Sequence, residues 1–175
     1  MKNISGKYDP KKDLGDALRL LNMVLEKNEK MVQHLDSQIN ILIGLSSAVF
    51  IFSTSRVLNS AEPTPFIFLA TFSALGALCG LFAVHPPKFM RKRGQTESLM
   101  YNKKITEFGS AEGYKKELSS LIGDQKAIVE QYANEIFNLS TYYYRPKREL
   151  FKFSRNLLLL GVLMSVALLL WQVVF

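Results

Sequence analysis

Apolar residues gather in three uninterrupted stretches, over residues 39–54, 66–84 and 156–175. A helix needs about 20 apolar residues to cross the hydrocarbon core of a bilayer, and the second and third stretches contain no charged residue. The first stretch is short at 16 residues. It reaches the required length by continuing past Arg56, whose long side chain can extend to the interface. The pattern predicts membrane helices at about 39–58, 66–84 and 156–175, and a buried helix of a soluble core is the alternative for the first.

The polar segments have the period of amphipathic helices. Within residues 1–38, apolar side chains recur three or four positions apart after Asp13, the expected N-cap. Neither glycine nor proline interrupts the chain from Asp16 to Ile43, which predicts one long helix running into the first apolar stretch.

The segment between the second and third stretches predicts two further helices. The first should run from Thr96 to Phe108, and the second from Ala111 to Tyr144. Arg145–Pro146 should stop or kink the second, because proline lacks the amide hydrogen and clashes with the preceding turn. The expected fold class is therefore an all-α integral membrane protein, with three transmembrane helices and a small cytoplasmic helical bundle.

Lys and Arg residues predict how the chain is oriented. Residues 1–38 carry seven of them, the loop 55–65 carries one, and residues 85–155 carry 14. Because positively charged loops stay in the cytoplasm, we expect the N-terminus inside and the C-terminus outside. The domains are then a cytoplasmic amphipathic helix (1–38), a transmembrane hairpin (39–84), a basic cytoplasmic helical region (85–155) and the third transmembrane helix (156–175).

The composition adds little support for catalysis. The net charge is +7, with 48% hydrophobic residues, and Cys79 is the single cysteine, so an intrachain disulfide is impossible. His34 and His85 lie in different segments and outside any metal-ligand spacing, and no glycine-rich phosphate loop is present. Carboxylates such as Glu130 and Glu135 are expected to face solvent. We expect neither an enzyme, nor a metal site, nor a bound cofactor.

Small residues recur inside the predicted spans. Gly76 and Gly80 lie one helical turn apart in the second span, and Gly161 and Ser165 repeat this spacing in the third. Such residues let helices approach closely in lipid, either within one subunit or between subunits. Uncharged polar residues also occur at membrane depth, and they could line a modest pore or form buried interhelical hydrogen bonds: Asn40, Ser46, Ser47, Thr71 and Ser73.

Basic residues cluster close to the predicted membrane. One interpretation is anchoring to anionic lipid, worth about 1 kcal/mol per residue near the surface. The other is an anion pocket, in which a tyrosine face stacks on a base and arginines bind phosphate. The candidate ligand-binding residues are Arg91, Lys92, Arg93, Lys103, Lys104, Tyr142, Arg145, Lys147 and Arg148.

The order of these segments resembles the transmembrane effectors of Pycsar, a bacterial antiphage system that signals with cyclic pyrimidine mononucleotides. The likeness is carried by HLDSQINILIGLSSAVFIF, by the HPP sequence after the second span, and by the segment from EQYANEIF to LLLLGVLMSV. In that family an acidic residue tends to be followed two positions later by lysine. Asp36 matches the acidic position, and Gln38 stands in place of the lysine.

The resemblance implies a bacterial inner-membrane effector that responds to a cyclic nucleotide, such as cCMP or cUMP, made by a partner cyclase. It implies impaired membrane integrity, contact with the lipid bilayer and a homo-oligomer, with no nucleic-acid polymer as partner. Two other functions stay open. One is a membrane-anchored adaptor or immunity protein that docks a cytosolic partner through its amphipathic helices, and the other is a lipid-binding structural protein.

Overall fold

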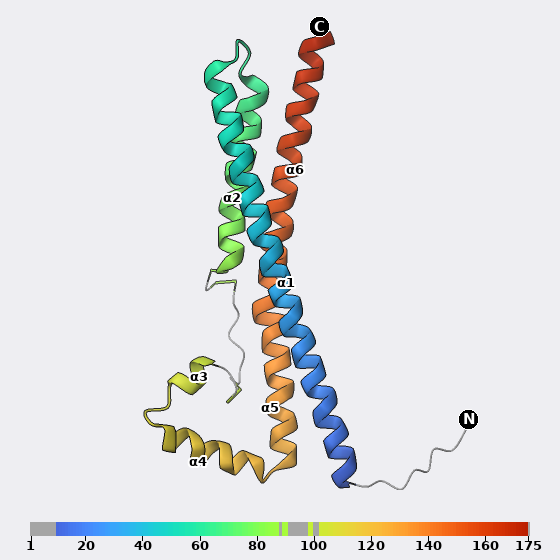
Figure 1. Cartoon of the computed structure of the whole chain (residues 1–175), viewed down its shortest axis with the longest axis vertical. Coiled ribbons are helices and arrows are strands. Elements are labelled where there is room, and N and C mark those ends of the chain that lie inside the picture. Colours follow the sequence, from blue (N-terminus) through green and yellow to red (C-terminus); the bar gives the residue numbers. More distant parts are fainter. Residues whose placement is uncertain (1–9, 88, 91–97, 100–101, 175) are drawn as a thin grey trace, which may run out of the picture. The chain divides into compact units, whose positions relative to one another are not determined.

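The structure, a computed structural model, describes residues 10–87, 89–90, 98–99 and 102–174, and the side chains of residues 15–87, 89–90, 98–99 and 104–174. Every regular element in these ranges is helical. In chain order they are α1 (Pro10–Asn59), α2 (Thr64–Val84), α3 (Asn102–Thr106), α4 (Ala111–Ile122), α5 (Gln125–Asn138), the π-helix η1 (Leu139–Tyr144) and α6 (Arg145–Val174) (Figure 1). The predicted all-α class is confirmed for this part of the chain.

Three of the helices are long and apolar enough to cross a membrane. They are α1, α2 and the continuous helical run that ends with α6. As far as the described residues reach, their apolar parts contain the three predicted stretches, so the prediction of three membrane-length helices is confirmed. The orientation in the bilayer stays a prediction.

The chain divides into two compact units. Unit 1 comprises Met1–Met31 and Arg93–Thr141, and unit 2 comprises Val32–Lys92 and Tyr142–Phe175. Helix α1 contributes to both units, and each unit is described by itself below.

Unit 2 is a bundle of the second part of α1 with α2 and α6, which run side by side in Figure 1. Glycines allow the close approach. A Cβ atom added to Gly80 would lie 2.7 Å from Ile43 Cγ1, and one added to Gly161 would lie 2.6 Å from Phe72 Cβ. Both distances are too short for a real Cβ, so a larger residue would force a shift of Ile43 at the first position and of Phe72 at the second.

The most deeply buried apolar side chains of unit 2 lie near one end of this bundle. Leu35, Ile39 and Ala83 form a cluster in which Ile39 and Ala83 are fully buried. Partly buried apolar side chains pack against it from all three helices: Ile43, Val84, Tyr144, Leu150 and Phe151. We call these eight residues, the three of the cluster and the five packed against it, the apolar plug.

Unit 1 contains α3, α4, α5 and the first part of α1. The predicted helix from Ala111 to Tyr144 is wrong, because α4 ends at Ile122 and α5 begins at Gln125. Asp124 is the N-cap of α5, and its carboxylate accepts hydrogen bonds from the backbone N–H groups of Lys126 (2.9 Å) and Ala127 (3.2 Å). This capping interaction favours a helix start where the apolar stripe alone suggests continuity.

Two other boundary predictions also change. Helix α1 begins at Pro10 rather than after Asp13, in agreement with the preference of proline for the first helical turn. Helix α3 covers Asn102–Thr106, whereas the predicted start at Thr96 lies outside the described residues.

The predicted stop or kink at Arg145–Pro146 takes the form of a π-helix. The six residues Leu139–Tyr144 connect α5 to α6 without a gap, and Pro146 lies buried in the first turn of α6. In an α-helix the proline ring would clash with the carbonyl of residue 142, four positions earlier. The wider π-helical turn relieves this clash, so the chain stays helical.

Candidate functional site

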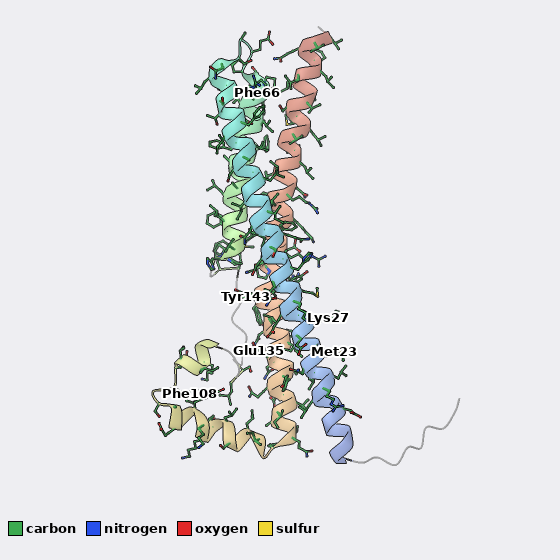
Figure 2. The ribbon with its side chains drawn as sticks, viewed as in Figure 1. Met23, Lys27, Phe66, Phe108, Glu135 and Tyr143 are labelled. Atoms are coloured by element: carbon green, nitrogen blue, oxygen red, sulfur yellow. The ribbon has the colours of Figure 1, made fainter. Side chains whose placement is uncertain are left out.

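Lys147 is the most deeply buried of the predicted ligand-binding residues that the structure describes, with 2% of its side chain exposed. Its ammonium donates to Asp36 Oδ1 at 2.6 Å, joining α6 to α1 within unit 2. The same ammonium lies 4.6 Å from the ring centroid of Tyr143, which Figure 2 labels. The carboxylate and the aromatic face both offset the desolvation cost of burying this charge.

This ion pair marks one end of the unit 2 bundle, which we call the charged end. The opposite end, at residues 60–63, connects α1 to α2 and is called the loop end. Asp36 adjoins Leu35 of the apolar plug in the sequence, so the plug lies at the charged end as well. The charged end therefore combines a dry apolar layer with a compensated charge.

Exposed basic side chains continue along α6 from this point. Arg145, Arg148, Lys152 and Arg155 are spaced three, four and three residues apart, which places them along one side of the helix. Arg145, Arg148 and Arg155 are exposed, and Lys152 is 44% exposed. We call these four residues the basic stripe.

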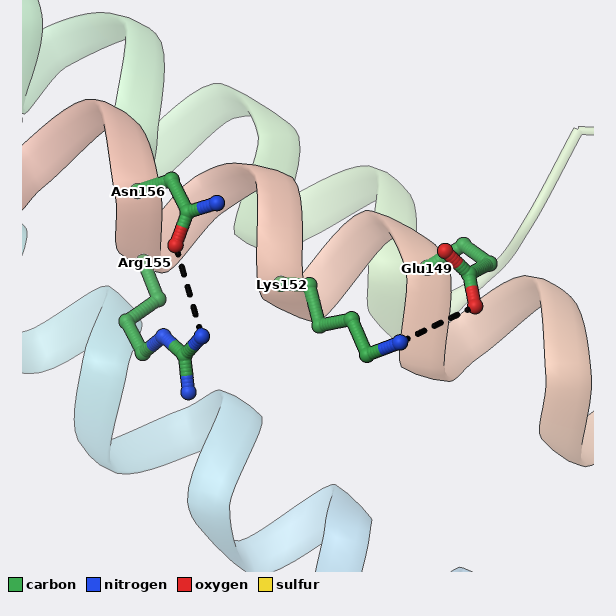
Figure 3. Close-up of polar contacts among 4 residues, drawn as sticks. All are labelled: Glu149, Lys152, Arg155 and Asn156. Carbon is green, nitrogen blue, oxygen red and sulfur yellow. Dashed lines mark hydrogen bonds and ion pairs between the residues drawn. The ribbon is translucent and has the colours of Figure 1, made fainter.

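Two members of the basic stripe have polar neighbours on the same helix. Lys152 Nζ lies 3.3 Å from Glu149 Oε1, and the Arg155 guanidinium lies 3.4 Å from Asn156 Oδ1 (Figure 3). The exposed ion pair is weak in water, since pairs of this kind contribute about 0–1 kcal/mol. The stripe can therefore exchange these partners for the phosphate oxygens of a lipid or a ligand.

The structure brings together only part of the predicted site. Arg145, Lys147 and Arg148 lie at the start of α6, directly after Tyr142 in η1, which is half-buried. Lys104 belongs to unit 1 and pairs with Glu107 at 3.7 Å. The side chain of Lys103 on α3 and the residues Arg91, Lys92 and Arg93 lie outside the described part.

Sequence reasoning missed two members of the charged end. Tyr143 holds its ring against the Lys147 ammonium, and the candidate ligand-binding residues include Tyr142 but not Tyr143. The four-residue spacing of Tyr143 and Lys147 was the available signal, because it brings side chains together on a helix. Asp36 carried no signal for pairing with Lys147, because 111 positions separate the two residues in the sequence.

The predicted packing residues all lie inside unit 2. Gly76, Gly80, Gly161 and Ser165 are buried. Gly76 contacts both other helices, since a Cβ added there would lie 3.4 Å from the Ser154 carbonyl oxygen on α6 and 3.5 Å from Ser46 Oγ on α1. In this structure the three glycines serve helix contacts within the chain.

Unit 1 holds a carboxylate that the sequence placed in solvent. Glu135 on α5, labelled in Figure 2, is half-buried, and its Oε2 atom has no hydrogen-bond partner among the described residues. Desolvation by burial raises the pKa of Glu135, a side-chain hydrogen bond with the fully buried Ser98 lowers it, and the charge of Glu29 raises it. The predicted exposure of Glu135 is therefore wrong, whereas Glu130 is exposed.

A neighbouring contact shows how this part of unit 1 is held. The side-chain carbonyl oxygen of Gln131, one turn before Glu135 on α5, accepts a hydrogen bond from the Leu99 backbone N–H at 2.9 Å. Ser98 and Leu99 are thus tied to α5 by adjacent polar contacts. Across the side chains that the structure describes, no group of three or more His, Cys, Asp or Glu residues could hold a metal.

Comparison with known proteins identifies the family. The family model described as the Pycsar effector protein domain (PycTM) matches residues 20–173. Comparisons with curated proteins and with solved structures found no match. The family match includes the apolar parts of all three membrane-length helices, the charged end and almost the whole of α6. The chain therefore belongs to the Pycsar effector family.

Proposed function

We propose that the protein is an inner-membrane effector of antiphage defence, which responds to a cyclic mononucleotide and impairs membrane integrity. One observation carries this proposal: the Pycsar effector domain coincides with three helices long enough to cross a bilayer. In the proposed orientation the charged end and unit 1 face the cytoplasm, where a partner cyclase would release its product. The role is non-enzymatic, and the protein acts as a homo-oligomer without a resident cofactor.

The proposed ligand is a cyclic nucleotide such as cCMP or cUMP. Its phosphodiester carries one negative charge, and its base presents an aromatic face. The exposed guanidinium groups of Arg145 and Arg148 suit the phosphodiester, because planar donors bind oxyanions through paired hydrogen bonds. Tyr142, three residues before Arg145, is the candidate for stacking on the base. Further candidates for phosphate contact are Arg91, Lys92, Arg93, Lys103 and Lys104.

Lys147 has a different place in this proposal. Its ammonium already contacts Asp36 and Tyr143, so it can bind an anion only by giving up the Asp36 carboxylate. A phosphodiester that binds at the basic stripe would compete with Asp36 for this charge. Such competition would loosen the tie between α1 and α6 and favour a second conformation of the bundle.

The test is dye release from liposomes that contain the purified full-length protein. The ligands are cCMP, cUMP, cAMP and cGMP, added separately, with protein-free liposomes as the control. We expect release with one or two of the four. Release with none would contradict the proposed trigger.

A charge reversal tests the ligand site. Arg145→Glu should raise the ligand concentration required for release by at least about tenfold, because it removes one charge-assisted contact and adds a repulsion. Arg19→Glu makes the same change at an exposed residue of α1 in unit 1 and is the matched control. An unchanged dose response in Arg145→Glu would exclude Arg145 from the site.

An adaptor is the second candidate, and unit 1 favours it. Large apolar side chains of unit 1 remain well exposed: Leu20 (59%), Met23 (65%), Ile122 (67%) and Phe137 (57%). Apolar side chains exposed outside a membrane often contact a protein partner. The two functions separate in cells, because strong expression of a gated membrane effector should slow growth and an adaptor should not.

A further inference from the structure

The interior of the unit 2 bundle contains several hydroxyl groups. Serine side chains from all three helices are buried there: Ser46 and Ser53 on α1, Ser73 on α2, and Ser154 and Ser165 on α6. The outer surface shows the reverse pattern, with large apolar side chains such as Ile41 (70% exposed) and Leu163 (67% exposed). The membrane part is therefore apolar outside and partly polar inside.

Three of these hydroxyls have hydrogen-bond partners. Ser53 Oγ donates to the carbonyl of Val49 at 2.6 Å, and Ser73 Oγ donates to the carbonyl of Leu69, both within their own helices. Ser154 Oγ donates across the bundle to the carbonyl of Gly76 at 2.7 Å. These bonds make the hydroxyls compatible with a closed bundle surrounded by lipid.

Ser46 is different. It is fully buried, and its Oγ atom has no hydrogen-bond partner among the described residues. It lies at Gly76, where α1, α2 and α6 meet, because a Cβ atom added to this glycine would contact Ser46 Oγ, the Ser154 carbonyl oxygen and Leu158 Cβ. An unpaired hydroxyl in such a place costs about 1–3 kcal/mol, and water is the ligand that satisfies both a hydroxyl and nearby carbonyl groups.

The apolar plug separates this polar interior from the charged end. Leu35, Ile39 and Ala83 leave at most 4% of their surface exposed. They precede the serines along the bundle, since Ile39 lies about two turns before Ser46 on α1. Apolar constrictions of this kind exclude water while closed and admit it when they widen.

We propose that the serine-lined interior of a single subunit is the path along which water and small solutes, ions and the dye among them, cross the membrane when the effector is active. Ser46 is the first internal hydration site beyond the apolar plug. The plug is the gate, and parting of the three helices opens it. This inference rests on the proposed impairment of membrane integrity, and it locates the leak inside the bundle rather than between subunits or in the lipid.

Cysteine accessibility tests the path directly. Ser46→Cys is almost isosteric, and Cys79→Ser supplies a background without any other thiol. Leu45→Cys, which is 53% exposed on the outer surface of the same helix, is the matched control. We expect a positively charged, membrane-impermeant thiol reagent to label Ser46→Cys at least about tenfold faster under conditions that release dye, with no change for Leu45→Cys.

Opening the plug by mutation tests the gate without any nucleotide. Ile39→Asn places an amide in the fully buried layer, whereas Ile41→Asn makes the same change at a residue that is 70% exposed. We expect dye release without ligand from Ile39→Asn and none from Ile41→Asn. Both proteins are first checked for incorporation into the liposomes, and if Ile39→Asn does not incorporate, the labelling of Ser46→Cys decides the question.

The outcomes separate this inference from the proposed trigger. Leakage from Ile39→Asn together with a wild type that answers no nucleotide would support the path and contradict the trigger. A wild type that releases dye with a nucleotide, while Ser46→Cys stays unlabelled, would overturn the path and leave the trigger standing. Labelling of Leu45→Cys alone would also overturn the path and place the leak on the outer surface.

Discussion

Unit 1 and unit 2 differ in how they bury apolar surface. In the described part of the chain, the buried apolar residues belong to unit 2: Val32, Leu35, Ile39, Leu42, Ala83 and Leu158. Helices α4 and α5 of unit 1 have no buried residue among those described. Elsewhere in the described part of unit 1, Ser98 is buried. Unit 2 is thus held by close helix contacts, whereas unit 1 leaves its amphipathic helices partly uncovered.

The difference shows how the two units respond to their surroundings. Exposed apolar side chains suit the lipid around unit 2, so its helices pack through small residues and a few polar contacts. In unit 1 the exposed apolar side chains meet water in the proposed topology, and little buried area opposes local opening. Changes inside unit 2 should therefore have larger effects on stability than changes in unit 1.

The largest effect is expected at the ion pair of unit 2. Asp36→Ala removes the carboxylate from a Lys147 ammonium that is 2% exposed, so the charge is left buried and uncompensated. We expect a loss of about 3 kcal/mol in the free energy of unfolding, at the low end for buried pairs because Asp36 itself is 40% exposed. Denaturant unfolding in detergent measures this loss.

The control for this prediction is Glu149→Ala, which removes the partner of the partly exposed Lys152. Its loss should not exceed about 1 kcal/mol. Equal losses in the two variants would mean that burial of Lys147 contributes nothing to the stability of the bundle.

An intermediate effect is expected where two helices touch. Gly161→Ala brings a methyl group to within 2.6 Å of Phe72 Cβ, and a Cβ atom cannot move away as the end of a flexible side chain can. We expect a loss of about 1–3 kcal/mol from overpacking. Gly44→Ala meets nothing within 4 Å and should gain up to about 1 kcal/mol from helix propensity. Thermal unfolding of both variants in the same detergent gives the comparison, and a stabilised Gly161→Ala protein would contradict the close contact.

The smallest effect is expected in unit 1, and it depends on pH. Because burial raises the pKa of Glu135 above its ordinary value of 4.5, the folded state binds this proton more tightly than the unfolded state does. The contribution of Glu135 to stability is present at low pH and is lost as the pH rises through the folded-state pKa. Glu135→Gln removes this loss, so its advantage over the wild type should grow with pH and stay below about 1 kcal/mol.

Hydrogen exchange of α5 between pH 4 and pH 7 measures that advantage. Glu130→Gln changes an exposed carboxylate of the same helix and is the control. An advantage that shrinks as the pH rises would show that Glu135 is stabilised in its charged form.

The membrane helices could be predicted because lipid constrains sequence strongly. A helix crossing a bilayer needs a long apolar run. Both limits of the run at 66–84 lie within two residues of the limits of α2, and the run that begins at 156 continues to the last described residue of α6. The break between α4 and α5 was hidden for the opposite reason. The apolar stripe continues past Gly123 and Asp124 with helical spacing, and the local hydrogen bonds of the Asp124 cap interrupt it.

The candidate site was less predictable, because neighbouring basic residues look alike in the sequence. Lys147 lies between Arg145 and Arg148, yet it alone of the three is buried. What distinguishes it is contact with Asp36 on another helix, and such pairing depends on how α1 and α6 are rotated about their axes. The exposed stripe on α6, by contrast, follows from the three- and four-residue spacing alone.

The π-helix has a consequence for chain length. A π-helical turn closes its hydrogen bonds over one residue more than an α-helical turn does. The segment η1 therefore contains an additional residue, and Pro146 follows it within an unbroken helix. A relative without this proline can join its two helices with one residue fewer and keep the same side of α6 inward. A single-residue gap near 139–144 in a sequence alignment is then a difference in helix winding, with no loop gained or lost.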